Sequence, residues 1–241
     1  MTDRREENVL NRLRKLYLSE KEKLKGYSLQ EKLSYIAEYY WLHILLITGS
    51  IAFVIYFVYH AFFTVKENWF YITFVNTLQE AGEDSALCQD FIEYAGYDLS
   101  EKNVLFNSAC YFDAARKGGT NNSYYQAFIA AIEAGAMDAA VMERDNFEAV
   151  ARSGRFQDLS AGEAAELFAP YEDLFVYCLP YDETYSETEV PVGIDLSGSP
   201  LVTEYGLYED GCVLGLSAYS QHPEEVVRFL EYLGVKTQEE K

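Results

Sequence analysis

The chain has 241 residues, which is room for one ordinary domain or two small ones. Apolar residues make up 49% of it and charged residues 24%, values typical of globular proteins, so neither a wholly disordered chain nor a fibrous repeat is expected. The net charge of −20 argues against nucleic-acid binding through a broad basic surface, because a phosphate backbone repels so acidic a protein.

Residues 1–38 form a slightly basic arm with nine Lys or Arg and seven Asp or Glu. Its apolar residues follow a near-heptad spacing among alternating charges, at Leu10, Leu13, Tyr17 and Leu24. This spacing predicts an amphipathic helix over residues 3–25. The arm is either a solvated helix that sets topology or a docking element for a partner helix or anionic headgroups. The narrow apolar stripe favours the solvated helix.

A second helix is expected to begin after Ser28, because Ser28 and Glu31 form the Ser-x-x-Glu pattern of a capping box. Residues 39–65 then contain no Asp, Glu, Lys or Arg. At about 1.5 Å per residue, the inner stretch 42–63 spans roughly 33 Å, enough to cross a hydrocarbon core of about 30 Å. Aromatic residues gather at both ends, as they do at membrane interfaces. Residues 39–65 are therefore predicted to be a transmembrane helix.

The charges on the two sides of this helix predict its orientation. Of the 19 basic and 39 acidic residues in the chain, 10 and 32 lie in residues 66–241, which gives this part a net charge of −22. Because basic residues near a span stay in the cytoplasm, we expect the N-terminus inside the cell and residues 66–241 outside it. The apolar block lies too far from Met1 and is too long for a signal peptide, so a permanent anchor is expected.

Beyond Lys66, short apolar runs alternate with amphipathic stretches. Strands are predicted at 69–75, 104–111, 137–142, 174–179 and 212–217, and helices at 84–94, 121–134, 146–153, 161–171 and 223–233. This alternation favours an α/β domain with a mostly parallel sheet flanked by helices. The stretch 181–210, rich in Glu, Gly, Pro and Ser, is expected to be a long irregular excursion on the surface.

Two stretches of this domain resemble the extracellular solute-binding proteins of bacterial ABC transporters, which have a type 2 periplasmic-binding-like fold. In residues 127–160 a helix leads through a glycine into a strand carrying an aspartate, and the next helix ends in Gly-x-Phe-x-x-Leu. The matching residues are Gly135, Asp138, Phe147, Gly154, Phe156 and Leu159. Residues 211–217 and 222–230 are similar to the family's last strand and helix. The Tyr-Tyr-Trp run at the start of the anchor resembles single-pass proteins of Gram-positive gut bacteria.

The resemblance covers roughly half of residues 66–241 and implies a truncated or single-lobed solute-binding fold. Two-lobed members usually have more than the 176 residues that this chain has after the anchor. The resemblance also implies a bacterial cell membrane, with the N-terminus cytoplasmic and the C-terminal part extracellular. Because members are commonly free or lipid-anchored rather than held by a helix, the resemblance is a better guide to fold than to transport.

Catalytic and metal-binding patterns are missing from the sequence. The three histidines do not stand at ligand spacing, and no G-x-S-x-G, P-loop or H-E-x-x-H motif is present. The acidic pairs Glu172/Asp173 and Asp182/Glu183 suit weak calcium binding, but their spacing matches no EF-hand, which favours a solvated acidic surface. We therefore expect a non-enzymatic protein without a metal or cofactor.

The loop at residues 117–123 is the best candidate for a binding site. It lies between a predicted strand and a predicted helix, where N–H groups and the helix dipole favour an anionic or polar ligand. The candidate ligand-binding residues are Gly118, Gly119, Thr120, Asn121, Asn122 and Tyr124. The alternative is a plain glycine turn with Thr120 or Asn121 as the helix N-cap, and such residues more often serve that purpose.

Four cysteines lie in residues 66–241, at Cys88, Cys110, Cys178 and Cys212. An extracellular location permits disulfides, and four cysteines allow one or two of them from three full connectivities. The alternative is buried free thiols, which is slightly favoured because three of the four fall in predicted strands. No Cys-x-x-Cys pair is present, so a thioredoxin-type redox motif is excluded.

The function expected from these features is that of a membrane-anchored extracytoplasmic binding module. Tyrosines flank several predicted loops and can stack on sugars or anchor a protein interface. The net charge of −22 favours a cationic peptide or protein over an anionic partner, and the family resemblance adds a small solute. The alternative is a structural or assembly subunit of a membrane transporter or secretion complex, recruited through the arm and the anchor.

Overall fold

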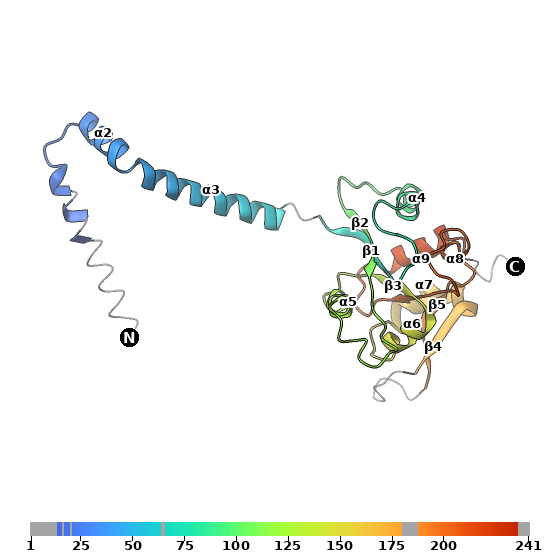
Figure 1. The fold of residues 1–241 in the computed structure, drawn as a ribbon. Coiled ribbons are helices and arrows are strands. Elements are labelled where there is room, and N and C mark those ends of the chain that lie inside the picture. Colours follow the sequence, from blue (N-terminus) through green and yellow to red (C-terminus); the bar gives the residue numbers. More distant parts are fainter. Residues whose placement is uncertain (1–13, 16, 20, 64–65, 180–187, 236–241) are drawn as a thin grey trace. The chain divides into compact units, whose positions relative to one another are not determined.

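Two units of the chain separate at Val65, where the uncharged segment ends. The computed structural model describes residues 14–15, 17–19, 21–63, 66–179 and 188–235. It divides into Met1–Val65 and Lys66–Lys241, and we call the second unit the C-terminal domain. Figure 1 shows the elements of each unit in the colours of the sequence.

Two consecutive helices, α2 (Leu29–Tyr39) and α3 (Trp41–Phe63), lead up to this boundary. The predicted capping box forms at the start of α2. The Ser28 N–H donates to Glu31 Oε2 at 2.7 Å, and the Glu31 N–H donates to Ser28 Oγ at 3.3 Å. Within the described residues, Trp41–His60 is the single helical stretch long and apolar enough to cross a membrane, and none of it is buried. This is compatible with the predicted single-pass anchor.

The C-terminal domain is built on a six-stranded sheet in the order β2-β1-β3-β6-β5-β4 (Figure 1). The strands are β1 (Asn68–Val75), β2 (Asn103–Cys110), β3 (Ala139–Met142), β4 (Phe175–Cys178), β5 (Val190–Asp195) and β6 (Val213–Leu216). β1 pairs in parallel with β2 and β3, whereas the β3–β6, β6–β5 and β5–β4 pairs are antiparallel. The α/β class is confirmed. The sheet is mixed, however, and the expectation of a mostly parallel sheet was wrong.

Part of this error comes from the stretch 181–210, which was expected to be irregular, and part from the antiparallel pairing of the two predicted strands β3 and β6. Its first seven residues lie outside the described ones, but the remainder supplies β5 and the short helix α8 (Pro200–Thr203). This strand was not predicted because it contains Pro191 and Gly193, and both residue types are depleted in strands. In the structure the Pro191 carbonyl accepts a hydrogen bond from the Leu159 N–H at 2.8 Å. β5 then brings two antiparallel pairings into the sheet.

Helices cover both faces of the sheet. They are α4 (Ala86–Ala95), α5 (Ser123–Glu133), α6 (Arg144–Ala151), α7 (Gly162–Phe168), the 3₁₀ helix η1 (Ala169–Leu174) and α9 (Pro223–Tyr232). Along β3, Ala139 and Val141 join one apolar core with α4, α7 and α9, whereas Ala140 and Met142 join a second core with α5 and α6. Successive residues of a strand point to opposite faces, so a sheet covered on both sides needs continuous apolar runs.

Candidate functional site

The loop predicted as the binding site is a helix cap. Asn122, not Thr120 or Asn121, caps α5, because its Oδ1 accepts a hydrogen bond from the Tyr124 N–H at 2.7 Å. Its Nδ2 donates to the Tyr111 carbonyl at 2.8 Å, which joins the cap to the residue after β2. The amide that caps the helix is therefore already engaged on both sides by the loop's own backbone.

The two glycines of this loop serve its own turn. Gly118 has a φ of 82°, a left-handed conformation that favours glycine. A Cβ on Gly119 would lie 1.6 Å from the Asp113 carbonyl oxygen, so no other residue fits there. None of the six predicted site residues lines the cavity that this domain has beside β4 and β5. Their geometry is that of a turn and an N-cap.

Hydrogen bonds hold the backbone of Phe112, in the segment after β2, at the ends of β1 and β3. In open α/β sheets, ligands bind where the strand order reverses, and here that point lies between β1 and β3. Asn76, just after β1, and Asn146, in the helix after β3, donate to the Phe112 carbonyl at 2.7 and 3.2 Å. Asn76 Oδ1 also accepts from the Phe112 N–H at 3.1 Å, and Phe112 is buried. The side chains of both asparagines thus fasten the chain's own loop over the usual ligand position.

A cavity of about 630 Å³ lies on the opposite half of the sheet, between the end of α6, residues 153–162 and the β4–β5 strands. Its apolar lining consists of Ala151, Phe156, Cys178, Val190, Val192 and Ala218. Polar side chains at its rim are Arg152, Ser153, Gln157 and Asp158. Ligand pockets are typically clefts of about 300–1,000 Å³ with an apolar lining and a few polar groups, and this cavity matches that description.

Two strand glycines leave room for a pair of stacked rings, one of which lines the cavity. The Phe156 ring stacks on the Phe147 ring, with centroids 4.9 Å apart and planes 8° from parallel. A Cβ on Gly215 of β6 would lie 2.6 Å from the Phe156 ring, and a Cβ on Gly193 of β5 would lie 2.4 Å from the Phe147 ring. The stacked rings therefore rest directly on the backbone of two neighbouring strands. Phe156 and the two strand glycines belong together as one packing unit.

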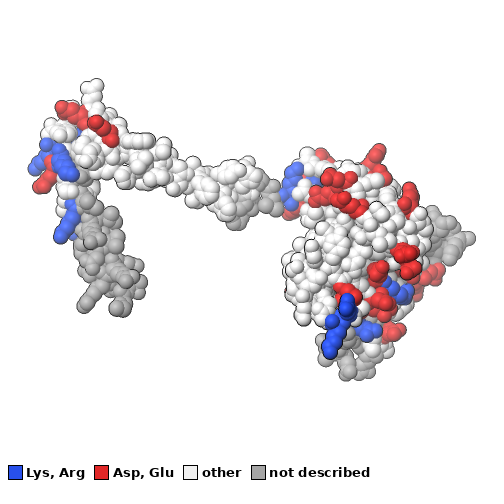
Figure 2. Space-filling model, in the orientation of Figure 1, with Lys and Arg blue, Asp and Glu red and all other residues white. Residues whose placement is uncertain are grey.

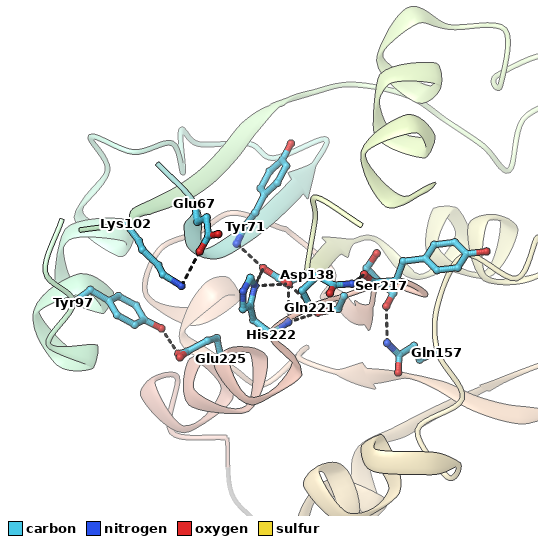
Figure 3. Close-up of polar contacts among 12 residues, drawn as sticks. Glu67, Tyr71, Tyr97, Lys102, Asp138, Gln157, Ser217, Gln221, His222 and Glu225 are labelled. Carbon is cyan, nitrogen blue, oxygen red and sulfur yellow. Dashed lines mark hydrogen bonds and ion pairs between the residues drawn. The ribbon is translucent and has the colours of Figure 1, made fainter. Parts of the chain in front are cut away.

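The polar rim offers one carboxylate oxygen to a ligand. Asp158 Oδ1 accepts hydrogen bonds from the Ser160 N–H at 2.9 Å and the Ser160 hydroxyl at 2.6 Å. Among the described residues no protein donor reaches Asp158 Oδ2, so that oxygen can accept from a ligand. Gln157 Nε2 donates to the Ser217 carbonyl at 3.0 Å, which holds the rim against β6 (Figure 3).

A buried carboxylate at the other end of the parallel strands serves as a fastening point. Asp138 is 2% exposed and lies before β3. Figure 3 shows it between Tyr71 of β1 and His222 at the start of α9. Its Oδ2 accepts from the Tyr71 N–H at 2.9 Å, and its Oδ1 accepts from the Ser220 hydroxyl at 2.8 Å. The His222 Nδ1 lies 3.2 Å from Oδ1. The carboxylate therefore ties β1, β3 and the loop before α9 together.

The oriented imidazole of His222 raises the question of catalysis. In the described residues Asp138 is the one hydrogen-bond partner of its ring, and no hydroxyl or thiol forms a hydrogen bond with that ring. Residues 14–63, 66–179 and 188–235, apart from the two undescribed positions of the arm, also contain no group of three His, Cys, Asp or Glu that could hold a metal ion. The geometry of Asp138 and His222 is that of a structural pair.

The four cysteines are buried and free. Cys110 ends β2 and Cys178 ends β4, the two strands at opposite edges of the sheet. Burial raises the pKa of Cys88, Cys110 and Cys212 to about 12. Burial also raises the pKa of Cys178, while a hydrogen bond from Arg152 acts in the opposite direction. All four thiols are therefore neutral at pH 7.

Sequence reasoning missed the cavity, although one signal for it was present. Phe156 was identified only as part of the Gly-x-Phe-x-x-Leu pattern, and β5, which supplies one wall, was not predicted. Comparison with protein-family models, with curated proteins and with solved structures gives no match for this chain. The similarity to solute-binding proteins therefore stays a prediction.

Proposed function

We propose that the protein is a non-enzymatic binding module, anchored in a bacterial cell membrane by α3, with its C-terminal domain outside the cell. The cavity above Phe156 is its ligand site. The observation that carries the proposal is the combination, in one cavity of about 630 Å³, of an apolar floor and an unpaired carboxylate oxygen at the rim. The α/β architecture is compatible with a single binding lobe but does not by itself imply this function.

The lining indicates the chemistry of the ligand. Phe156, Val190 and Val192 suit an apolar body, and Asp158 Oδ2 suits a hydrogen-bond donor or a cation. The C-terminal domain carries a net charge of −22, which raises the local concentration of cations by long-range attraction. A small solute with an amine, or an apolar side chain of a cationic peptide, meets both conditions.

The test uses the full chain in neutral detergent micelles. Its melting temperature is measured with hexylamine, single amino acids and dipeptides that combine Lys or Arg with Phe or Leu. Ala161→Trp places a large ring at the rim of the cavity, where Ala161 is exposed. Ala127→Trp is the control, because Ala127 is exposed on α5 and does not line the cavity.

A compound that raises the melting temperature of the wild type and of the Ala127 variant, but not of the Ala161 variant, supports the proposal. A compound that stabilises all three proteins equally binds elsewhere and speaks against the cavity as the site. The proposal is also abandoned if no amine or cationic dipeptide shifts the melting temperature of the wild type.

A second candidate function, an assembly subunit of a membrane complex, is favoured by one face of α3. Three small residues, Thr48, Gly49 and Ala52, lie together on that face, and small residues allow membrane helices to pack closely. The distinguishing experiment captures the full chain from membranes and compares it with a chain whose residues 1–65 are replaced by an unrelated single-pass anchor. An assembly subunit loses its partners on replacement, whereas a ligand-binding domain keeps its ligand-dependent stabilisation.

A further inference from the structure

A groove of about 930 Å³ in the first unit gathers four lysines around apolar side chains. The lysines are Lys15, Lys21, Lys25 and Lys32, and Tyr17, Leu18 and Leu24 line the same groove. We propose that this groove binds the phosphate headgroup of an anionic phospholipid of the cytoplasmic leaflet. The proposal rests on the membrane anchoring of α3 and on the predicted orientation, but not on the cavity of the C-terminal domain.

The groove is formed at a turn of the arm that precedes α2. The Lys25 N–H donates to the Glu22 carbonyl at 3.1 Å, and the Tyr27 N–H donates to the Leu24 carbonyl at 3.3 Å. Gly26, at the centre of this turn, has a φ of 106°, which an L residue rarely adopts. The turn lets Lys32 of α2 line the same groove as Lys15, Lys21 and Lys25, which precede the turn. Figure 2 shows blue side chains at this turn, with red side chains beside them.

The charge of the groove is unbalanced. In the described part of the chain, none of the four lysines forms an ion pair, and the groove is lined by a single acid, Glu22. Glu31, the nearest acid on α2, is engaged by Ser28 in the capping box, and these hydrogen bonds lower its pKa. Cations held close together without a counter-ion repel one another, so a bound anion offsets that repulsion.

The apolar residues of the groove favour a lipid over a soluble anion. Tyr17 is 66% exposed and Leu18 is 53% exposed, so both apolar surfaces lie open beside the lysines. Residues 33–40 alone separate Lys32 from the start of α3. The headgroup layer borders the end of a membrane helix, and lysines near it attract anionic lipids of the cytoplasmic leaflet. A phospholipid offers a phosphate to the lysines and a glycerol-acyl region to the apolar side chains.

The test uses the full chain in a neutral detergent and native mass spectrometry. Phosphatidylglycerol and phosphatidylcholine with the same acyl chains are titrated separately, and inorganic phosphate and glycerol phosphate form two further arms. We expect phosphatidylglycerol to bind at least tenfold more tightly than phosphatidylcholine, and neither soluble phosphate to compete with it at equal concentration.

Three double variants localise the effect. A lysine near an anionic surface contributes about a fivefold change in affinity, so Lys21→Gln with Lys25→Gln is expected to weaken phosphatidylglycerol binding about 25-fold. Arginine at both positions keeps the charge and is expected to retain binding. The charge-matched control is Lys66→Gln with Lys117→Gln, both in the C-terminal domain, and it should bind like the wild type.

Two results overturn the proposal: equal affinity for the two lipids, or an equal loss in the Lys66/Lys117 control. Displacement of the lipid by an equal concentration of inorganic phosphate or glycerol phosphate would identify the groove as a site for a soluble phosphate instead. These outcomes are independent of the cavity above Phe156. A failure here leaves the ligand-binding function untouched, and a failure there leaves the groove untouched.

Discussion

Phe112 and Phe156 are two buried rings of one domain that have opposite effects on ligand access. Asn76 and Asn146 hold the Phe112 backbone at the ends of β1 and β3, where α/β sheets usually bind ligands, and the Phe112 ring packs against Tyr125 and Phe128. Phe156 packs against the backbone of β6 because Gly215 has no side chain, and it lines an open cavity. The position of the candidate site therefore depends on how each ring is packed.

The largest expected effect comes from removing the Phe112 ring. Phe112→Ala deletes a buried side chain that packs against the rings of Tyr125 and Phe128, each with its centroid 5.1 Å away. We expect a loss of about 3–5 kcal/mol in the free energy of unfolding, measured by denaturant titration of the full chain in micelles. Tyr124→Ala, at an exposed ring, is the control and should cost far less. A loss below that of the control would contradict the packing of the Phe112 ring against Tyr125 and Phe128.

A smaller effect is expected from displacing the Phe156 ring. In Gly215→Ala the new Cβ meets the Phe156 ring, and overpacking of this kind costs about 1–3 kcal/mol. The displaced ring should also enter the cavity and abolish the stabilisation by any ligand found there. Gly198→Ala is the control, because a Cβ at Gly198 meets nothing within 4 Å. Retained ligand binding in the Gly215 variant would mean that Phe156 is not the floor.

The next effect concerns the hydrogen bonds by which Asn146 holds the segment around Phe112. Asn146 is buried, its Oδ1 accepts from the Ala114 N–H at 2.7 Å, and its Nδ2 donates to the Phe112 carbonyl. Asn146→Ala leaves the Ala114 N–H without its partner, whereas the Phe112 carbonyl keeps its hydrogen bond from Asn76. The loss should cost about 1–2 kcal/mol. Asn121→Ala, at an exposed residue of the predicted loop, should change the melting temperature little. A larger drop in melting temperature in the Asn121 variant than in the Asn146 variant would contradict this prediction.

The sequence allowed the layered α/β fold to be predicted because its signals are local. Apolar runs at β1, β3 and β6 and the capping pattern at Ser28 each depend on neighbouring residues, and the structure contains them at the expected places. β5 was missed because Pro191 and Gly193 interrupt its apolar pattern. The reason for that glycine, the Phe147 ring above it, lies far away in the sequence.

The candidate site was less predictable than the fold. A glycine-rich loop before a helix indicates a phosphate or anion site only if its N–H groups are free, and the side chain of Asn122 already caps this helix. The cavity depends on Phe156, Cys178 and Val192, which come from three separate segments. No spacing in one sequence shows that such residues meet, because their contact is a property of the sheet order.

The smallest expected effect is a difference in modification rate between the thiols of Cys110 and Cys178. Cys110 and Cys178 belong to the same apolar core as Phe112 and Phe156, but Cys178 also lines the cavity and Cys110 does not. Burial raises the pKa of Cys110 to about 12, and for Cys178 the hydrogen bond from Arg152 opposes part of the rise. At pH 9 we therefore expect iodoacetamide to modify Cys178 several times faster than Cys110, as measured by peptide mass spectrometry.

The same labelling experiment shows whether the cavity controls this difference. Ala161→Trp at the rim should slow the modification of Cys178 and leave that of Cys110 unchanged. Because the pKa of Cys110 is raised above the ordinary thiol value of 9.0, its contribution to stability is complete below pH 9 and is lost as the pH rises toward 12. Labelling is therefore measured at or below pH 9, where modification of Cys110 reports opening of the apolar core around Phe112. Equal modification rates at the two thiols would contradict the prediction that the cavity makes Cys178 more accessible than Cys110.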